Sequence, residues 1–96
     1  MDEERIFYAY IMASVSGTLY VGFSNDLFDR VEKHKSGFYE GFSKKYRCYK
    51  LVYYEEFEYP DEAITRERQI KKWNRKKKEN LIKEMNPSWK DLSLDW

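Results

Sequence analysis

Apolar and aromatic residues gather in two short stretches near the start of the chain, Ile6 to Ala13 and Thr18 to Phe23. Both stretches are rich in the aromatic and β-branched residues that strands favour. The residues between them, Ser14-Val15-Ser16-Gly17, have a composition typical of a turn. The pattern therefore predicts an antiparallel β-hairpin at the beginning of the chain.

The next apolar residues follow helical spacing. Leu27, Phe28 and Val31 recur on one side of a 3.6-residue period. Residues 24–26 are Ser, Asn and Asp, which commonly cap the N-terminus of a helix. Gly37 would end this helix as a left-handed cap.

The second half of the chain begins with an expected loop at 38–47 and a third strand at 48–57. A second helix is predicted from Pro60 to about Trp73, because proline fits the first helical turn. A third helix would run from about Arg75 to Met85 and stop before Asn86-Pro87.

The remaining residues would dock through Trp89 and Leu92. The expected order is strand, strand, helix, strand, helix, helix. This order predicts an α/β fold of the α+β type, a three-stranded antiparallel sheet with flanking helices. At 96 residues the chain has the length of one domain, so we expect residues 1–96 to form a single unit.

The only cysteine is Cys48, so no internal disulfide can form and no cysteine pair is available for zinc. A lone cysteine suits a reducing compartment. No apolar run approaches the roughly 20 residues of a membrane-spanning helix, and the acidic residues 1–4 are unlike a signal peptide. We therefore expect a cytoplasmic protein without a membrane partner.

Charge is unevenly distributed along a chain whose net charge is only +1. Residues 66–83 contain nine Lys or Arg and two Glu, a net charge of +7, whereas residues 55–62 contain five acids and no base. Such a segregated field can bind a polyanion on one face while the whole chain stays near neutral.

Glu67 interrupts the apolar pattern of the second expected helix. Ala63, Ile64 and Ile70 define an apolar arc, and Glu67 projects inside it. A carboxylate there should be paired, protonated or bound to a cation, because desolvating it alone is costly. An ordinary ion pair with Arg30 or with a lysine remains open.

Arg30 and His34 are four residues apart, so they lie on one face of the first expected helix. Arginine presents a fixed fork of donors to a phosphate, and histidine can accept or relay a proton near neutral pH. The alternative is a surface arginine beside a half-buried histidine that hydrogen-bonds to the backbone.

Tyrosines are frequent in the two hairpin strands. Tyr8 and Tyr10 share one face of their strand, because side chains alternate with a period of two. In a hairpin closed near Val15-Ser16, Tyr10 and Tyr20 would lie almost opposite one another and their hydroxyls would emerge together. Each tyrosine alone is equally consistent with a core residue.

Together these residues resemble the GIY-YIG nuclease family, and most closely its short, single-domain bacterial members. Tyr20-Val21-Gly22 has the form of the YIG half, and Tyr8-Ala9-Tyr10 stands where the GIY half would be. Arg30 and His34 follow Tyr20 at the spacing of that family's catalytic Arg and His, and Glu67 lies on the helix that carries its metal-binding Glu. The resemblance covers nearly the whole chain. It departs at the GIY half, where only the final tyrosine is kept, and at Phe23, where several relatives carry a small or basic residue.

The resemblance implies a metal-dependent endonuclease that hydrolyses phosphodiester bonds in DNA, including structured or damaged DNA in repair or recombination. Glu67 would hold one Mg²⁺ or Mn²⁺ ion, and Arg30 would stabilise the charge of the transition state. Tyr20 or Tyr10 would orient the attacking water. His34 would relay the proton or hold the tyrosine in place.

DNA is the expected partner, and no small-molecule cofactor is implied. Contacts to phosphates are expected from basic residues of the segregated stretch and of the loop: Lys71, Lys72, Arg75, Lys76, Lys77, Lys78, Lys44 and Lys45. The lysine run is equally consistent with a solvated helix face. Aromatic residues of the 38–47 loop would either stack on unpaired bases or cap the core.

Two other readings stay open. The chain could be a catalytically weak nucleic-acid-binding module of the same fold, or an interaction domain whose acidic segment 55–62 meets a basic partner. Neither the target DNA nor the oligomeric state follows from the sequence, and dimerisation of so small a domain to cut both strands stays open.

Overall fold

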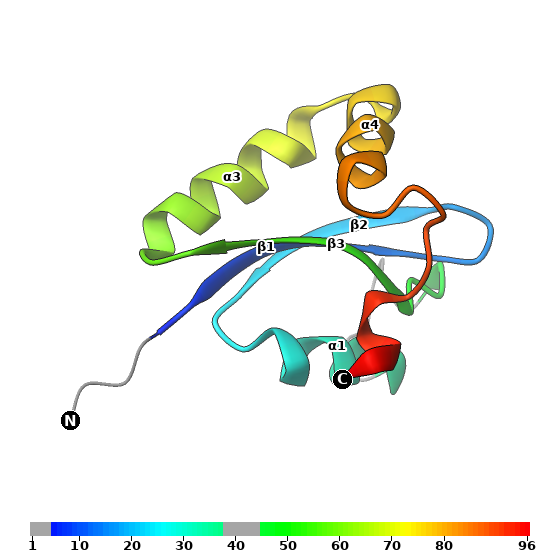
Figure 1. Ribbon diagram of the computed structural model, residues 1–96, viewed down its shortest axis with the longest axis horizontal. Helices are drawn as coiled ribbons and strands as arrows, with labels where there is room; N and C mark the ends of the chain where they lie inside the picture. The colour runs from blue at the N-terminus through cyan, green and yellow to red at the C-terminus, as the bar shows by residue number, and fades with distance from the viewer. Residues whose placement is uncertain (1–4, 38–44) are drawn as a thin grey trace.

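A computed structural model describes residues 5–37 and 45–96 of the protein (Figure 1). In chain order its elements are β1 (Phe7–Ala13), β2 (Leu19–Ser24), α1 (Leu27–Lys35), β3 (Lys50–Phe57), α3 (Pro60–Lys72), α4 (Arg75–Met85) and the short 3-10 helix η1 (Leu92–Asp95). The predicted β-β-α-β-α-α order and the α+β fold class are confirmed. The expected loop at 38–47 lies largely outside the described residues.

β1 is the centre of an antiparallel sheet with the strand order β2-β1-β3, so β2 and β3 are its edges. A tight turn joins β1 to β2, in which the Ser14 N–H donates a hydrogen bond to the Thr18 carbonyl over 2.9 Å. Gly17 has a φ of +96°, a conformation that glycine adopts without steric cost. The predicted hairpin is therefore confirmed.

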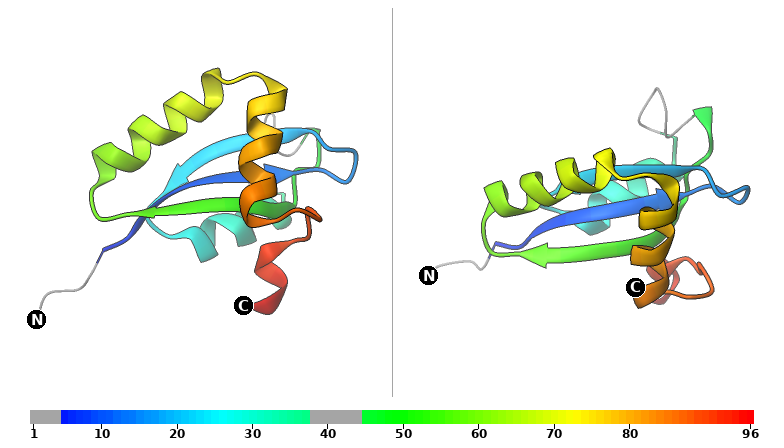
Figure 2. Two further views of the ribbon diagram at one scale, coloured as in Figure 1. Left: turned by 45° about the horizontal axis from the view of Figure 1, so that its top comes forward. Right: turned by 90° about the horizontal axis from the view of Figure 1, so that it is seen from above.

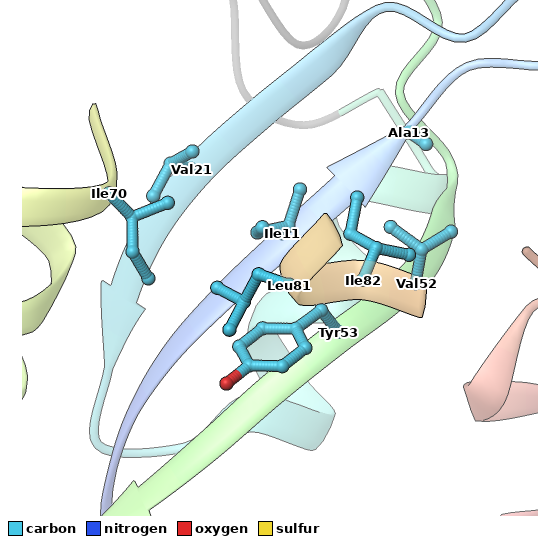
Figure 3. Packing of buried hydrophobic residues seen from close by; sticks show 8 residues of the cluster. All are labelled: Ile11, Ala13, Val21, Val52, Tyr53, Ile70, Leu81 and Ile82. Carbon is cyan, nitrogen blue, oxygen red and sulfur yellow. The ribbon is translucent and has the colours of Figure 1, made fainter. Parts of the chain in front are cut away.

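Helices cover both faces of the sheet: α3 and α4 lie on one face and α1 on the other (Figure 1). Side chains alternate along a strand, so neighbouring residues of β1 enter different cores. The core under α3 and α4, drawn in Figure 3, contains Ile11, Ala13, Val21, Val52, Tyr53, Ile70, Leu81 and Ile82. The core under α1 contains Tyr10, Met12, Leu27, Val31, Cys48 and Leu51.

Local capping interactions set the ends of the helices. The Asp26 side chain accepts a hydrogen bond from the Asp29 N–H and caps the start of α1. After α1, Gly37 has a φ of +73° and its N–H donates to the His34 carbonyl, as a left-handed cap requires. Asn74 caps α4 by accepting from the Lys77 N–H. The predicted helix limits are correct to within one residue at these ends.

The segment after α4 runs from the α3/α4 face to the α1 face and contacts β3 on the way (Figures 1 and 2). Trp89 packs against the first core and Leu92 against the second, so the predicted docking through these two residues is confirmed. Asp91 secures the crossing, because its carboxylate accepts hydrogen bonds from Lys35 of α1 and from the Leu51 N–H of β3. The C-terminal segment thereby joins both layers of helices to one edge of the sheet.

Candidate active site

A hydrogen bond between two buried side chains lies at the centre of the candidate site. Tyr10 of β1 is fully buried, and its hydroxyl is 2.9 Å from Nε2 of His34 on α1. His34 itself is only 2% exposed. The bond ties the central strand to the helix that packs on it and holds the Tyr10 hydroxyl away from solvent. The expectation that the hydroxyls of Tyr10 and Tyr20 would emerge together is therefore wrong for Tyr10, whose side chain is fully buried.

Tyr20, on the edge strand β2, lies beside this pair. Its ring centroid is 5.0 Å from that of His34, edge to face, and 6.3 Å from that of Tyr10. The strand register places Tyr10 opposite Gly22 and Tyr20 opposite Met12, so the two tyrosines are diagonal neighbours and do not lie directly opposite. Tyr20 is half-buried and keeps part of its surface in solvent.

Gly22 makes room for the Tyr10 ring. A Cβ atom at position 22 would lie 2.5 Å from both Cζ and the hydroxyl oxygen of Tyr10, well inside van der Waals contact. The glycine of the Tyr20-Val21-Gly22 tripeptide is thus needed because the tyrosine of the neighbouring strand crosses directly over it. The tripeptide is visible in the sequence, but the close approach of the Tyr10 ring to Gly22 is not, because it depends on the register of the two strands.

His34 is held in its neutral form. Burial, reinforced by the nearby positive charge of Arg30, lowers the pKa of His34 from 6.5 to about 4. Arg30 is half-buried and lies one turn before His34 on α1. At neutral pH a neutral imidazole therefore faces the Tyr10 hydroxyl, with a guanidinium close by. This arrangement favours a histidine that positions the tyrosines.

Glu67 lies on α3, the helix that covers the opposite face of the sheet. Its side chain is 14% exposed and forms an ion pair with Lys71, one turn further along α3, at 2.7 Å. Of the partners considered from the sequence, the lysine is therefore the one observed. The structure brings Tyr10, Tyr20 and His34 into contact, with Arg30 one turn before His34, whereas Glu67 lies on the helix of the opposite face.

The β2 edge connects the two parts. α3 packs against β1 and β2, and Ile70 of α3 lies beside Val21 of β2 in the core (Figure 3). Tyr20 is the immediate neighbour of Val21 and points to the α1 side. A ligand that touches both Glu67 and Tyr20 would therefore have to lie along this edge strand.

The donor set fits a hard, largely hydrated cation. No group of three or more His, Cys, Asp or Glu residues that could hold a metal ion comes together within residues 5–37 and 45–96. Mg²⁺ keeps several waters and is often bound through one or two carboxylates together with substrate phosphates. The single Glu67 carboxylate is suited to such an ion, provided that Lys71 gives way.

The predicted phosphate-contacting residues are mostly at the surface. Lys71, Lys72, Arg75, Lys76 and Lys77 are exposed and Lys78 is partly buried. Some are already engaged: Arg75 pairs with Glu79 and lies over the Trp89 ring, and Lys77 lies over the Trp73 ring. In the loop, Lys45 is exposed and Lys44 lies outside the described residues.

Comparison with known proteins places this constellation in a family. The family model of the GIY-YIG catalytic domain matches residues 6–80, which include every residue of the cluster and Glu67. The chain belongs to the GIY-YIG family. It is therefore a domain of a nuclease family whose members are generally endonucleases and typically use a divalent metal ion.

Small proteins of this family are similar over nearly the whole chain. A UPF0213 protein from Staphylococcus aureus strain Mu3 is 43% identical over 77 residues, which make up 80% of this chain and 94% of that protein. A UPF0213 protein from strain N315 of the same species matches equally. The solution NMR structure of a UPF0213 protein from Bacillus halodurans has a TM-score of 0.59 and 27% identity, and the match covers 92% of this chain and 94% of that one.

In this GIY-YIG domain, no helix within the described part of the chain is both long enough and apolar enough to cross a membrane.

Proposed function

We propose that this protein is a metal-dependent endonuclease that hydrolyses phosphodiester bonds in DNA, acting on structured or damaged DNA in repair or recombination. The observation that carries the proposal is the interlocked arrangement of Tyr10, Tyr20 and His34 beside Arg30, within a domain of a nuclease family. In this cluster the buried polar atoms of Tyr10 and His34 are paired with each other, which fixes the positions of both side chains. Its substrate would be met in the cytoplasm, which the single unpaired cysteine also suits.

Tyr20 would be the tyrosine that meets the attacking water. Tyr10 is fully buried and its hydroxyl is hydrogen-bonded to His34, whereas Tyr20 keeps partial exposure. His34, neutral and wedged against both rings, would fix the orientation of Tyr20. His34 and Tyr10 are in this proposal positioning residues.

Arg30 and Glu67 would act on the phosphate from the two sides of the β2 edge. The Arg30 guanidinium would stabilise the negative charge that develops on the phosphate oxygens in the transition state. Glu67 would hold a Mg²⁺ or Mn²⁺ ion after its ion pair with Lys71 opens, and the ion would supply charge neutralisation at the scissile phosphate. Lys71, once released, would be free to contact the DNA backbone.

A cleavage assay with Mg²⁺ or Mn²⁺ on linear, nicked, flapped and four-way DNA tests the proposal. It compares the wild type with Arg30→Ala and Glu67→Gln. Loss of a transition-state donor typically lowers the rate by about 10²- to 10³-fold, and we expect a loss of at least this size in both variants with DNA binding retained. Cleavage that persists unchanged in Glu67→Gln would point to a contaminating nuclease.

The second candidate is a nucleic-acid-binding module with a weakened site. It is favoured by the ion pair with Lys71, which gives Glu67 a cation without any metal. A wild type that cuts none of the four substrates, but still binds them in a salt-dependent manner, would establish this alternative.

A further inference from the structure

An aromatic pocket opens on the α1 face of the sheet, at the N-terminal end of α1. It has a volume of about 290 Å³ and is lined by Tyr8, Leu27, Phe28, Tyr54, Glu56 and Trp96. Tyr8 and Tyr54 come from the neighbouring strands β1 and β3, Phe28 comes from the first turn of α1, and Trp96 follows η1. None of these residues belongs to the cluster of Tyr20, Arg30 and His34.

The rings are arranged in two pairs. Tyr8 and Tyr54 meet edge to face, with centroids 6.3 Å apart, and Phe28 and Trp96 stack with centroids 6.0 Å apart. Phe28 remains 58% exposed and Trp96 50% exposed, although aromatic side chains of this size are usually covered in a monomer. Although the two rings contact each other, each keeps about half of its surface open to a ligand.

The charge on the lining of the pocket is negative. Glu56 is the charged residue among the described lining residues, and its side chain forms no hydrogen bond or ion pair with another described residue. Glu56 also lines an adjoining pocket, which it shares with Arg5. Burial and the nearby carboxylates of Glu56 and Asp26 also raise the pKa of Tyr8. A phosphate-bearing ligand would be repelled here, whereas a cation would be attracted by both the carboxylate and the ring faces.

We propose that this pocket binds the guanidinium group of an arginine side chain presented by a partner protein. A planar guanidinium can stack on an exposed face of Phe28 or Trp96 and donate two parallel hydrogen bonds to the Glu56 carboxylate. A lysine ammonium could use the charge but could form neither the stack nor the paired hydrogen bonds. The proposal is independent of the nuclease activity.

Titration of the ¹⁵N-labelled protein with a blocked Gly-Arg-Gly peptide, followed by NMR, tests this site. We expect saturable shifts of the Trp96 indole N–H and of the amides of Phe28 and Glu56. The peptide in which citrulline replaces arginine has nearly the same shape without the charge, and it should shift these signals much less. Blocked Gly-Lys-Gly should bind more weakly than the arginine peptide.

Two variants form a matched pair. Glu56→Gln removes the carboxylate of the pocket, and because the charge-assisted hydrogen bonds to the guanidinium are lost with it, affinity for the arginine peptide should fall about tenfold or more. Glu58→Gln removes the next acid along the chain, which does not line this pocket, and should leave affinity within about twofold because salt screens the more distant charge. Trp96→Leu, at an exposed position, should abolish the saturable shifts while the rest of the spectrum keeps its dispersion.

Three results would overturn the proposal. The citrulline peptide could bind as well as the arginine peptide, which would make the pocket merely apolar. Cytidine could shift the same signals more strongly than the peptide, which would indicate a nucleobase site. Glu56→Gln and Glu58→Gln could weaken binding equally, which would indicate nonspecific attraction to the acidic segment.

Discussion

His34 interacts with three different groups of the candidate site. It shares a hydrogen bond with the Tyr10 hydroxyl, packs its ring against Tyr20 and lies within the field of Arg30. Because the side chain is buried, protonating the imidazole would place a positive charge where water cannot solvate it, and this is energetically costly. The same residue therefore couples the geometry of the site to the stability of the fold.

Replacing His34 by Gln should remove part of the pH dependence of stability. The pKa of His34 is about 4 in the folded protein and 6.5 in an unperturbed histidine, so between these values the unfolded chain binds more protons. The free energy of unfolding of the wild type should therefore decrease as the pH falls from 6.5 towards 4, by up to about 3 kcal/mol from this group. Urea unfolding of both proteins at several pH values measures the difference, and parallel curves for the two proteins would contradict the buried, neutral histidine.

Gly22→Ala should destabilise the protein through a single steric conflict. The added Cβ would overlap the Tyr10 ring, and overpacking of this kind typically costs about 1–3 kcal/mol. In a Tyr10→Leu background the ring is absent, so the same substitution should cost clearly less. Chemical denaturation of the four proteins of this cycle gives the coupling energy, and an additive result would show that the glycine is needed for another reason.

Side-chain interactions were predictable from the sequence only between residues that are close in the chain. Lys71 follows Glu67 by four residues, so the ion pair could be read from helical spacing as one of the alternatives. The bond between Tyr10 and His34 joins residues 24 apart, and no local pattern indicates it. The family resemblance named both residues, but the burial of the Tyr10 hydroxyl depends on packing that the sequence does not display.

At the scale of elements, the prediction succeeded where short-range signals mark the ends. Asp26 and Gly37 cap α1, and Pro60 opens α3, as their residue types indicate. The third strand begins at Lys50 and not at Cys48, since Arg47 adopts a left-handed φ of +57° and accepts a hydrogen bond from the Tyr49 N–H in a turn. The register of β1 and β2 was less accessible, because it is set by the geometry of the turn.

The C-terminal segment depends on Asp91 for its crossing to the α1 face. Burial alone would raise the pKa of Asp91, but hydrogen bonds from Lys35, Ser93 and Leu51 together lower it. A carboxylate with a lowered pKa stabilises the fold at neutral pH, and this contribution is lost as the pH falls into the acidic range.

Asp91→Ala should therefore loosen the segment from β3. Loss of these hydrogen bonds leaves Lys35 and the Leu51 N–H without their acceptor, which typically costs about 1–3 kcal/mol. Hydrogen exchange should become faster at the Leu51 amide in particular. Asp95→Ala, an exposed acid of the same 3-10 helix, is the control. Equal effects of the two substitutions would show that Asp91 has no special part in the crossing.

Over the whole molecule, positive charge is concentrated in residues 66–83, and we propose that this stretch contacts DNA. Removal of one lysine that contacts a phosphate should reduce the slope of the logarithm of the DNA-binding constant against the logarithm of the salt concentration by about one unit. Lys76→Ala should show this change, and Lys90→Ala, exposed but outside the basic stretch, should not. Fluorescence anisotropy with labelled DNA at several salt concentrations measures it. Identical slopes for Lys76→Ala and the wild type would exclude this residue from the interface.

The largest step from sequence to the proposed function is the joining of residues from two helices on opposite faces of the sheet into one active site. α1 carries Arg30 and His34, α3 carries Glu67, and the edge strand β2 with Tyr20 lies between them. Neither periodicity nor charge indicates that their side chains reach a common ligand. The family resemblance supplies that expectation, and the described contacts join only the α1 side of it.

Paramagnetic broadening by Mn²⁺ tests directly whether Glu67 of α3 shares one site with Tyr20 of β2 and Arg30 of α1. Bound Mn²⁺ broadens the NMR signals of nearby nuclei, so titration of the labelled protein locates the ion without any need for turnover. If Glu67 holds the ion at the β2 edge, the signals of Glu67, Tyr20 and Arg30 should broaden first, and Glu67→Gln should abolish the effect. Broadening that centres on the acidic residues 55–62 and persists in Glu67→Gln would contradict a shared site for the two helices.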